Sequence, residues 1–485
     1  MANFAERFKK FVLKVFNINE WVQEYSINRE FTFQSNALKN RLWYDGDAYE
    51  LQQFYEQTIN NTNQFWGSTE TRGQEIRRIH TGLPALIVDS LVNITANNLE
   101  DLKFDNEAQE EIWNSIDDAD SFKSQIADLT RTALIVGDGA VKFTYDMDIS
   151  KTPVLDIVPG DRVDIIRQKG FLKEVKFYTY YTYRSEQYTL EETYGYGYIN
   201  YKLFNKEGNE CSLSMLPETN GLEDVVFDSS VILAVPFKFF DSTKYEGRGR
   251  SIYEGKSDAF DAIDEVVSQW MDALRAGRTK TYIPASLIPT DPNGGYLLTP
   301  NSFDNRFIKI GADMSEGAKN QITTEQPEIK TDAYLQTYVT VLDLAIQGVI
   351  SPSTLGIDNK KLDNAEAQRE KEKCTLYTRS AIIENLDTII ETIIQTSFNC
   401  LSIMYNKALV EVPVSVGFSE YANPSFEAVV EVMSNPNTPM SIEAKIEELW
   451  GDSKTDEWKA EEVKRVKAER GIVELEEPAL NQVIE

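Results

Sequence analysis

Histidine and cysteine are nearly absent from this sequence. The 485 residues include one histidine, His80, and three cysteines, Cys211, Cys374 and Cys400. The cysteines are far apart and form no C-x-x-C pair, which argues against a disulfide framework and against a zinc site. Any Ser-His-Asp or Cys-His nucleophile system would have only one possible base. Because His80 lies beside the apolar run that begins at Leu83, we interpret it as a structural residue.

Long hydrophobic runs are also missing. The best candidate, LPALIVDSLV, is interrupted by Asp89 and is shorter than the roughly 18 residues that suggest a membrane-spanning helix. No signal-peptide pattern opens the chain. We therefore expect a soluble, non-secreted protein with no membrane partner. With 41% hydrophobic residues it can bury substantial cores, and at about 100–200 residues per domain we expect two to four modules.

Basic residues are too few to balance the acidic ones. The chain has 49 Lys and Arg against 78 Asp and Glu, a formal net charge of −29. Affinity for nucleic-acid phosphates comes mainly from Lys and Arg, so this charge argues against a sequence-specific DNA-binding protein. It does not exclude a protein that lets DNA pass without gripping it.

The spacing of apolar residues predicts an α+β protein. Alternating aromatic and polar residues predict a β-rich region over 140–240 and one further strand over 410–418. The basic amphipathic segment 3–16 is interpreted as a helix that docks on its own fold or on a neighbouring subunit. Helical periodicity predicts helices over residues 3–16, 36–66, 84–97, 257–276, 331–348, 364–406, 441–450 and 455–470.

Two predicted helices of similar length flank a proline-rich insertion. Helix 257–276, with Ser257 as its expected N-cap, would be about 30 Å long. Helix 331–348 has Thr331 as its expected N-cap, and the insertion 281–329 contains short strands such as RFIKIG. Two such helices should return antiparallel, which places the insertion at one end of the pair.

The other end of the pair leads into a loop, residues 350–363. This loop carries the adjacent Lys360 and Lys361 beside Asn359. Long loops inside compact domains are usually functional or disordered.

The stretch EGRGRSIYEGKSD, residues 246–258, is similar to a phosphate-binding loop. The G-x-x-x-x-G-K-[ST] motif needs four residues between its glycines, but five separate Gly249 from Gly255. A nucleotide hydrolase centred on Gly255, Lys256 and Ser257 is therefore an alternative that we do not favour. We interpret the stretch as a flexible strand-to-helix junction and Lys256 as a surface or interface residue.

A metal-dependent nuclease is a second alternative. Asp156, Glu174 and Lys176 have the loose spacing of such a site. A Glu-x-Lys pair on one strand is also an ordinary way to place opposite charges on a solvated face. With no other catalytic constellation, we expect neither an enzyme nor a cofactor or metal site.

The order of these elements resembles the portal proteins of tailed bacteriophages, of the siphophage type found with Gram-positive hosts. The resemblance spans about residues 40–470 and includes IRRIHTGLPALIVDSLVN, GDGAVKFTYD with DIVPGDRV, and GRSIYEGKSDAFDAIDEVVSQ. It implies a portal-like α+β fold divided into an N-terminal segment and wing (1–255), first stem helix (256–280), clip (281–330), second stem helix (331–349), tunnel loop (350–363), long helix and wing strand (364–421), and crown with C-terminal tail (422–485).

The resemblance further implies a ring of twelve subunits at one capsid vertex of the virion, assembled in the host cytoplasm. Double-stranded DNA would pass through the ring during packaging and ejection. The implied partners are the terminase large subunit, a head-completion or adaptor protein, the scaffold and the major capsid protein. Because no ATPase motif is present, the energy for DNA movement would come from a partner.

Two groups of residues are candidates for contact with DNA in such a ring. Asn359, Lys360 and Lys361 would lie on the tunnel loop. The second group, at the junction of stem and clip, could instead form salt bridges between subunits and consists of Arg275, Arg278 and Lys280.

Overall fold

The computed structural model has the mixed α+β composition that the sequence predicts. The chain divides into two compact units, residues 1–417 and 418–485. Among the described residues, no helix is long and apolar enough to cross a membrane. The structure describes residues 31–58, 64–68, 76–145, 150–288, 307–311, 321–357, 365–419, 441–450 and 456–469, so the helix predicted over 3–16 lies outside the described residues.

The helix predicted over 36–66 is two helices, α2 (Phe33–Asp45) and α3 (Ala48–Thr58). The break is at Gly46, whose φ of 72° places it in the left-handed region. Its N–H donates to the carbonyl oxygen of Leu42 and so closes α2. The single-helix prediction was wrong because this glycine ends the first helix.

Three further helices surround the start of the first sheet. The helix predicted over 84–97 is α4 (Leu83–Ile94), with Pro84 in its first turn, followed by the short 3-10 helix η1 (Ala96–Asn98). Helices α5 (Glu107–Asp120) and α6 (Phe122–Val136) follow. The last residues of α6 are buried and lead directly into the first sheet.

The β-rich region forms two antiparallel sheets, which confirms the prediction over 140–240. One is three-stranded with the order β10-β2-β3, and the other has the order β4-β5-β6-β7-β8, with β9 paired to β7. Tyr181 and Tyr188 stand opposite each other across β5 and β6, whereas Tyr178 and Tyr180 face Glu191 and Thr189. The strands are β2 (Asp138–Thr144), β3 (Val154–Pro159), β4 (Val163–Gln168), β5 (Phe171–Tyr183), β6 (Glu186–Gly195), β7 (Tyr198–Asn205), β8 (Glu210–Cys211), β9 (Val225–Val226) and β10 (Ala234–Lys238).

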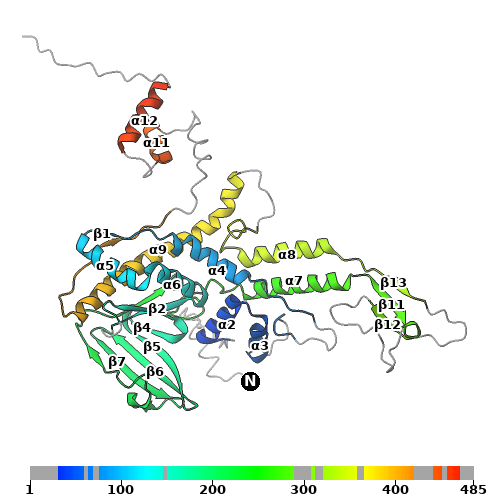
Figure 1. Ribbon diagram of the computed structural model, residues 1–485, viewed down its shortest axis with the longest axis horizontal. Coiled ribbons are helices and arrows are strands. Elements are labelled where there is room, and N and C mark those ends of the chain that lie inside the picture. The colour runs from blue at the N-terminus through cyan, green and yellow to red at the C-terminus, as the bar shows by residue number, and fades with distance from the viewer. Residues whose placement is uncertain are drawn as a thin grey trace, which may run out of the picture. The chain divides into compact units, whose positions relative to one another are not determined.

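Helices α7 (Ser257–Ala276) and α8 (Thr331–Ile346) run antiparallel and side by side (Figure 1). The rings of Trp270 and Tyr334 stack between them with centroids 6.1 Å apart. We call this pair the α7–α8 hairpin. A small sheet lies at its far end, made of β11 (Lys280–Pro284), β12 (Phe307–Ile310) and β13 (Thr323–Glu325).

The N-caps predicted for these two helices were wrong. Lys256 and Lys330 hold the N-cap positions, and Ser257 and Thr331 are already the first helical residues. The chain enters α7 through Gly255, whose φ is 79°. This left-handed residue lets the helix begin directly after Lys256.

The long helix predicted over 364–406 is α9 (Ala365–Met404). Its second half buries an apolar face that includes Ile382, Leu386 and Ile390. The strand predicted over 410–418 is reduced to β14 (Val414–Ser415), which pairs antiparallel with β1 (Lys103–Phe104).

The second unit contains α11 (Ile442–Trp450) and α12 (Asp456–Glu469), as predicted. The two helices contact each other through an ion pair in which Lys467 Nζ lies 2.8 Å from Glu443 Oε1. Ile446 is buried within this unit.

Candidate functional site

Lys256, which looked like a phosphate-binding lysine in the sequence, contacts the end of α8. Its Nζ donates hydrogen bonds to the carbonyl oxygens of Leu344, at 3.0 Å, and Gln347, at 2.7 Å. These carbonyls lie at the C-terminus of the helix, where a cation is favourable. Burial lowers the pKa of this lysine. The interpretation as a surface or interface residue therefore gains a specific role, because Lys256 joins the start of α7 to the end of α8.

The loop before Lys256 is packed inside the protein and leaves no phosphate cradle. Tyr253 is fully buried and its hydroxyl donates to the carbonyl oxygen of Pro84 at 2.7 Å. Ser251 is also buried and donates to the carbonyl oxygen of Leu134 at 3.0 Å. The backbone N–H groups of Ile252, Glu254 and Lys256 also donate to carbonyl oxygens of the protein itself.

A buried carboxylate explains the glycines of this loop. Asp138 accepts hydrogen bonds from the N–H of Gly249, at 2.7 Å, and from Arg248 Nη2, at 3.0 Å. Burial raises the pKa of Asp138, and the charge of Arg248 opposes that shift. A Cβ on Gly249 would collide with the carbonyl oxygen of Gly137. No local sequence pattern predicts this contact, which fixes the loop to the start of β2.

Two carboxylates on α7 hold a distant segment of the chain. Asp264 Oδ2 lies 2.7 Å from His80 Nδ1, and Asp264 Oδ1 accepts from the backbone N–H of Thr81 at 2.9 Å. Asp261 accepts from the backbone N–H groups of Phe65, at 2.8 Å, and Trp66, at 3.2 Å. His80 is thus buried in a structural network, as the sequence analysis interpreted it.

The nuclease candidates pair with other residues: Asp156 lies 3.4 Å from Lys142 Nζ, and Glu174 lies 3.0 Å from Lys173 Nζ. Asp156 belongs to β3, whereas Glu174 and Lys176 belong to β5 of the other sheet. Lys176 pairs with Glu191 at 2.9 Å. Within the described parts of the chain, no group of three or more His, Cys, Asp or Glu residues is placed to hold a metal ion.

The loop predicted to contact DNA begins in a well-anchored segment. The backbone N–H of Ser351 donates to Thr375 Oγ1 of α9 at 2.9 Å, and Thr378 Oγ1 donates to the carbonyl oxygen of Val349 at 2.7 Å. The candidates further along the loop, Asn359, Lys360 and Lys361, lie outside the described residues.

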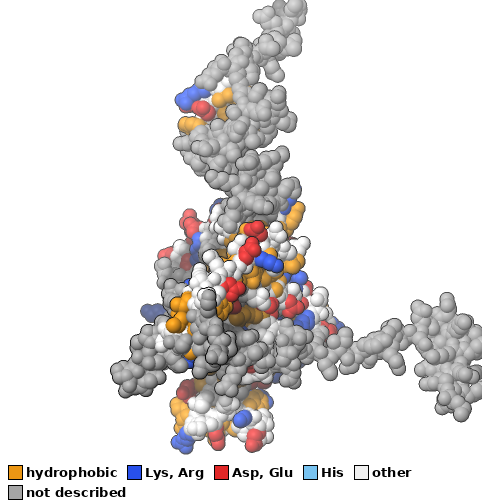
Figure 2. Space-filling view, turned by 90° about the vertical axis from the view of Figure 1, so that its right-hand side faces the viewer, with side chains coloured by type: hydrophobic (Ala, Val, Ile, Leu, Met, Phe, Trp, Pro, Cys, Tyr) orange, Lys and Arg blue, Asp and Glu red, His pale blue; other side chains and the backbone are white. Residues whose placement is uncertain are grey.

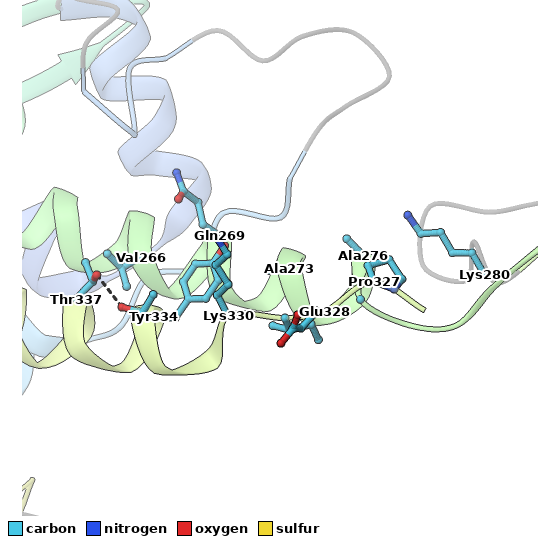
Figure 3. Close-up of a pocket in the computed structure, with 13 residues that line it drawn as sticks. Val266, Gln269, Ala273, Ala276, Lys280, Pro327, Glu328, Lys330, Tyr334 and Thr337 are labelled. Atoms are coloured by element: carbon cyan, nitrogen blue, oxygen red, sulfur yellow. Dashed lines mark hydrogen bonds between the residues drawn. The ribbon is translucent and has the colours of Figure 1, made fainter. Parts of the chain in front are cut away.

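The second group of candidates surrounds the far end of the α7–α8 hairpin. Arg275 lies in the last turn of α7, Arg278 follows it, and Lys280 begins β11. Lys280 lines a hollow of about 610 Å³ between the two helices and the segment 327–330 (Figure 3). On the face seen in Figure 2, Lys and Arg side chains are scattered among hydrophobic and acidic ones.

Comparison with known proteins assigns the family. The family model described as "Phage portal protein, SPP1 Gp6-like" matches residues 23–348, well over half of the chain. The match runs from before α2 to just beyond α8 and so includes both sheets and the α7–α8 hairpin. A search of curated proteins found no match. The chain therefore belongs to the SPP1 Gp6-like family of phage portal proteins.

Proposed function

We propose that this chain assembles into a closed ring of about twelve copies at one vertex of a phage capsid, and that double-stranded DNA passes through the ring during packaging and ejection. The observation that carries the proposal is the family match over residues 23–348. The narrower assignment to siphophages of Gram-positive hosts is part of the proposal.

The elements of the fold support a division of labour within the ring. The helices and sheets up to residue 255 form the wing, the α7–α8 hairpin forms the stem, and the small sheet β11–β13 belongs to the clip. Residues 350–363 are the tunnel loop, α9 braces the wing, and the helices α11 and α12 belong to the crown. In this scheme the clip docks the terminase large subunit and later a head-completion or adaptor protein. Scaffold and major capsid protein meet the outer surface during assembly in the host cytoplasm.

The charge of the chain suits a channel that DNA must slide through. Twelve copies at −29 each carry about −350 formal charges, which repel phosphates and reduce adhesion. A few cations at the narrowest point would guide the DNA. We assign this role to Lys360 and Lys361, with Asn359 as a neutral phosphate contact. Arg275, Arg278 and Lys280 either contact DNA or bridge neighbouring subunits.

The proposed role requires no catalysis by this chain. The portal is a structural conduit, and the terminase supplies the energy for DNA movement. The packed loop around Tyr253 and the engagement of Lys256 with α8 support this assignment.

Native mass spectrometry of the purified full-length chain tests the ring. We expect a species that is a whole multiple, about twelve, of the 55.3 kDa subunit. A protein that stays monomeric over the whole range of ionic strength and concentration would contradict the proposal.

A further inference from the structure

An apolar stripe on α7 is covered at one end and exposed at the other. Phe260 and Ile263 are each only 1% exposed, whereas Met271 is 41% and Leu274 is 40% exposed. The covered half packs on the N-terminal part of the chain, as in the contact of Phe260 with Trp43, whose ring centroids lie 5.8 Å apart. Among the described residues, this cover ends before Met271.

Helix α8 repeats the pattern in the opposite chain direction. Leu342 and Ile346 are buried, whereas Leu335 is 52% and Val339 is 46% exposed. These four positions follow the spacing of one helical face. Because the helices are antiparallel, both exposed halves lie at the end of the hairpin that carries β11–β13 (Figure 1). We call the exposed set, Met271, Leu274, Leu335 and Val339, the stem ridge.

A groove lies on the other side of the same two helices. It is the hollow of about 610 Å³, and three alanines leave space in its wall, namely Ala273, Ala276 and Ala333. The side chain of Ile329 fills the space beside Gly277, and the charged residues Lys280, Glu328 and Lys330 lie at its edge toward β11. Tyr334 and Thr337 of α8 complete its wall (Figure 3). We call it the stem groove.

Ridge and groove occupy nearly opposite faces of each helix. Each ridge residue is two positions from a groove residue, as Met271 is from Ala273 and Leu335 is from Ala333. At 3.6 residues per turn, two positions correspond to about 160° around the helix. The hairpin therefore presents large apolar side chains on one side and, on the other, a cavity with several alanines in its wall.

We infer that the stem groove of one copy receives the stem ridge of the next copy in the ring. This inference rests on the proposed ring and names the surfaces that join its members. Because the two surfaces differ and face opposite ways, each copy can bind one neighbour through its groove and another through its ridge. Such a heterologous contact continues from copy to copy until the ring closes, whereas a surface that binds itself stops at a dimer.

We assign a second copy of the chain as the occupant of the stem groove, because the stem ridge supplies large apolar side chains that can fill the open space of the groove. Four large apolar side chains, each about half exposed, form a patch of the kind that marks an interaction site. They continue apolar stripes that the chain already covers on the other half of each helix. The wall of the groove combines alanines with apolar side chains such as Val266 and Ile329, so insertion of the ridge would bury apolar surface on both copies at once.

Cross-linking between two single-cysteine proteins tests the direction of the contact. The ridge protein carries Leu274→Cys and the groove protein carries Ala276→Cys, both in a background of Cys211→Ser, Cys374→Ser and Cys400→Ala. The two are co-expressed with different tags and treated with a short bis-maleimide. We expect covalent dimers that contain one of each protein, and few in rings made of either protein alone.

The control replaces the ridge cysteine with Phe171→Cys, at a highly exposed position at the start of β5. This protein should not cross-link to the groove protein. Intact rings without mixed dimers, or equal cross-linking in rings of one protein alone, would overturn the ridge-and-groove contact and leave the proposed function standing. A wild-type chain that never forms rings would overturn both.

A second experiment fills the groove with Ala276→Trp. We expect the concentration at which half of the chain is in rings to rise by about tenfold or more, a loss of about 1.4 kcal/mol. The exposed Phe171→Trp serves as the matched control and should assemble like the wild type. Unchanged assembly of Ala276→Trp, with thermal unfolding that shows a folded protein, would mean that another molecule or solvent occupies the groove.

Discussion

Lys256 Nζ lies 2.7 Å from the carbonyl oxygen of Gln347, which joins the first turn of α7 to the end of α8. This bond crosses the base of the hairpin, at the opposite end from β11–β13. The end of α8 leads along the chain into segment 350–363, which we propose as the tunnel loop. One side chain therefore fixes the relative position of both helices where they enter the body of the protein.

Replacing Lys256 with methionine should loosen this base. The variant keeps most of the apolar stem of the side chain and loses two hydrogen bonds to helix-end carbonyls. We expect the free energy of unfolding to fall by about 1–2 kcal/mol, measured by urea denaturation. Lys206→Met, at an exposed turn position, is the matched control and should change it by less than about 0.5 kcal/mol.

The same variant tests the alternative of a nucleotide hydrolase. We expect no magnesium-dependent ATP turnover by the wild type or by Lys256→Met, because Lys256 contacts α8 and the preceding loop is packed. A colorimetric phosphate-release assay measures it. Turnover by the wild type that disappears in the variant would contradict a purely structural role.

Asp264→Asn should destabilise the first unit strongly. Asp264 accepts hydrogen bonds from the Trp66 indole, at 3.2 Å, and from both the N–H and the hydroxyl of Thr81, and it contacts His80. An amide has one acceptor oxygen, and an NH2 group in place of Oδ2 would face the indole N–H of Trp66, which is itself a donor. We expect a loss of about 2–3 kcal/mol in the free energy of unfolding.

Asp258→Asn is the control, since Asp258 is exposed in the first turn of the same helix. It should cost less than about 1 kcal/mol, the value of a favourable charge at a helix N-terminus. Equal effects of the two substitutions would show that the buried network at Asp264 adds nothing.

The stability of the first unit should depend on pH through Asp261. Burial raises the pKa of this carboxyl from its ordinary value of 3.8 to about 6, with smaller contributions from the nearby Glu265 and Asp264, while the N–H groups of Phe65 and Trp66 oppose the shift. Between these two values the folded state binds the proton that the unfolded state has lost. The contribution of Asp261 to stability therefore falls as the pH rises from about 4 to 6.

Urea denaturation of the wild type and of Asp261→Asn at a series of pH values measures this contribution. Relative to Asp261→Asn, the wild type should lose a few kcal/mol in its free energy of unfolding as the pH rises from about 4 to 6. Above about pH 6 the difference between the two proteins should stay constant. A difference that does not change with pH would show that Asp261 titrates normally in the folded protein.

Replacing both Lys360 and Lys361 with alanine should impair passage of DNA without affecting the ring. In the proposed channel, removing two cations from each copy would weaken the attraction to DNA phosphates. We expect a several-fold drop in packaged genomes per particle, measured by nuclease protection. Normal packaging by intact rings would remove both lysines from the DNA path. Lys202→Ala with Lys206→Ala, on the six-stranded sheet and its turn, is the matched control.

The helices could be predicted closely because their signals are local. Helix α7 matches its predicted range, 257–276, since an apolar stripe and the glycine at 277 mark its course and end. Only the N-cap was assigned wrongly: Lys256, not Ser257, holds that position. The left-handed conformation of Gly255 lets Ser257 be the first helical residue. The strand predicted over 410–418 is present but short, because its regular pairing with β1 is limited to Val414 and Ser415.

The network around Asp261 and Asp264 could not be predicted from local patterns. Its partners lie between 183 and 198 residues away in the sequence. A signal was present, since two carboxylates on the apolar side of an amphipathic helix need buried donors. The identity of those donors depends on the tertiary fold. Likewise, the series of small residues at 273, 276 and 277 becomes a groove only when α8 packs beside it.

The most direct test of the portal function is electron microscopy of the purified full-length chain. We expect closed rings around a central channel, with the α7–α8 hairpins arranged about that channel. Particles without a central hole at every ionic strength, or rings whose hairpins point away from the channel, would contradict it.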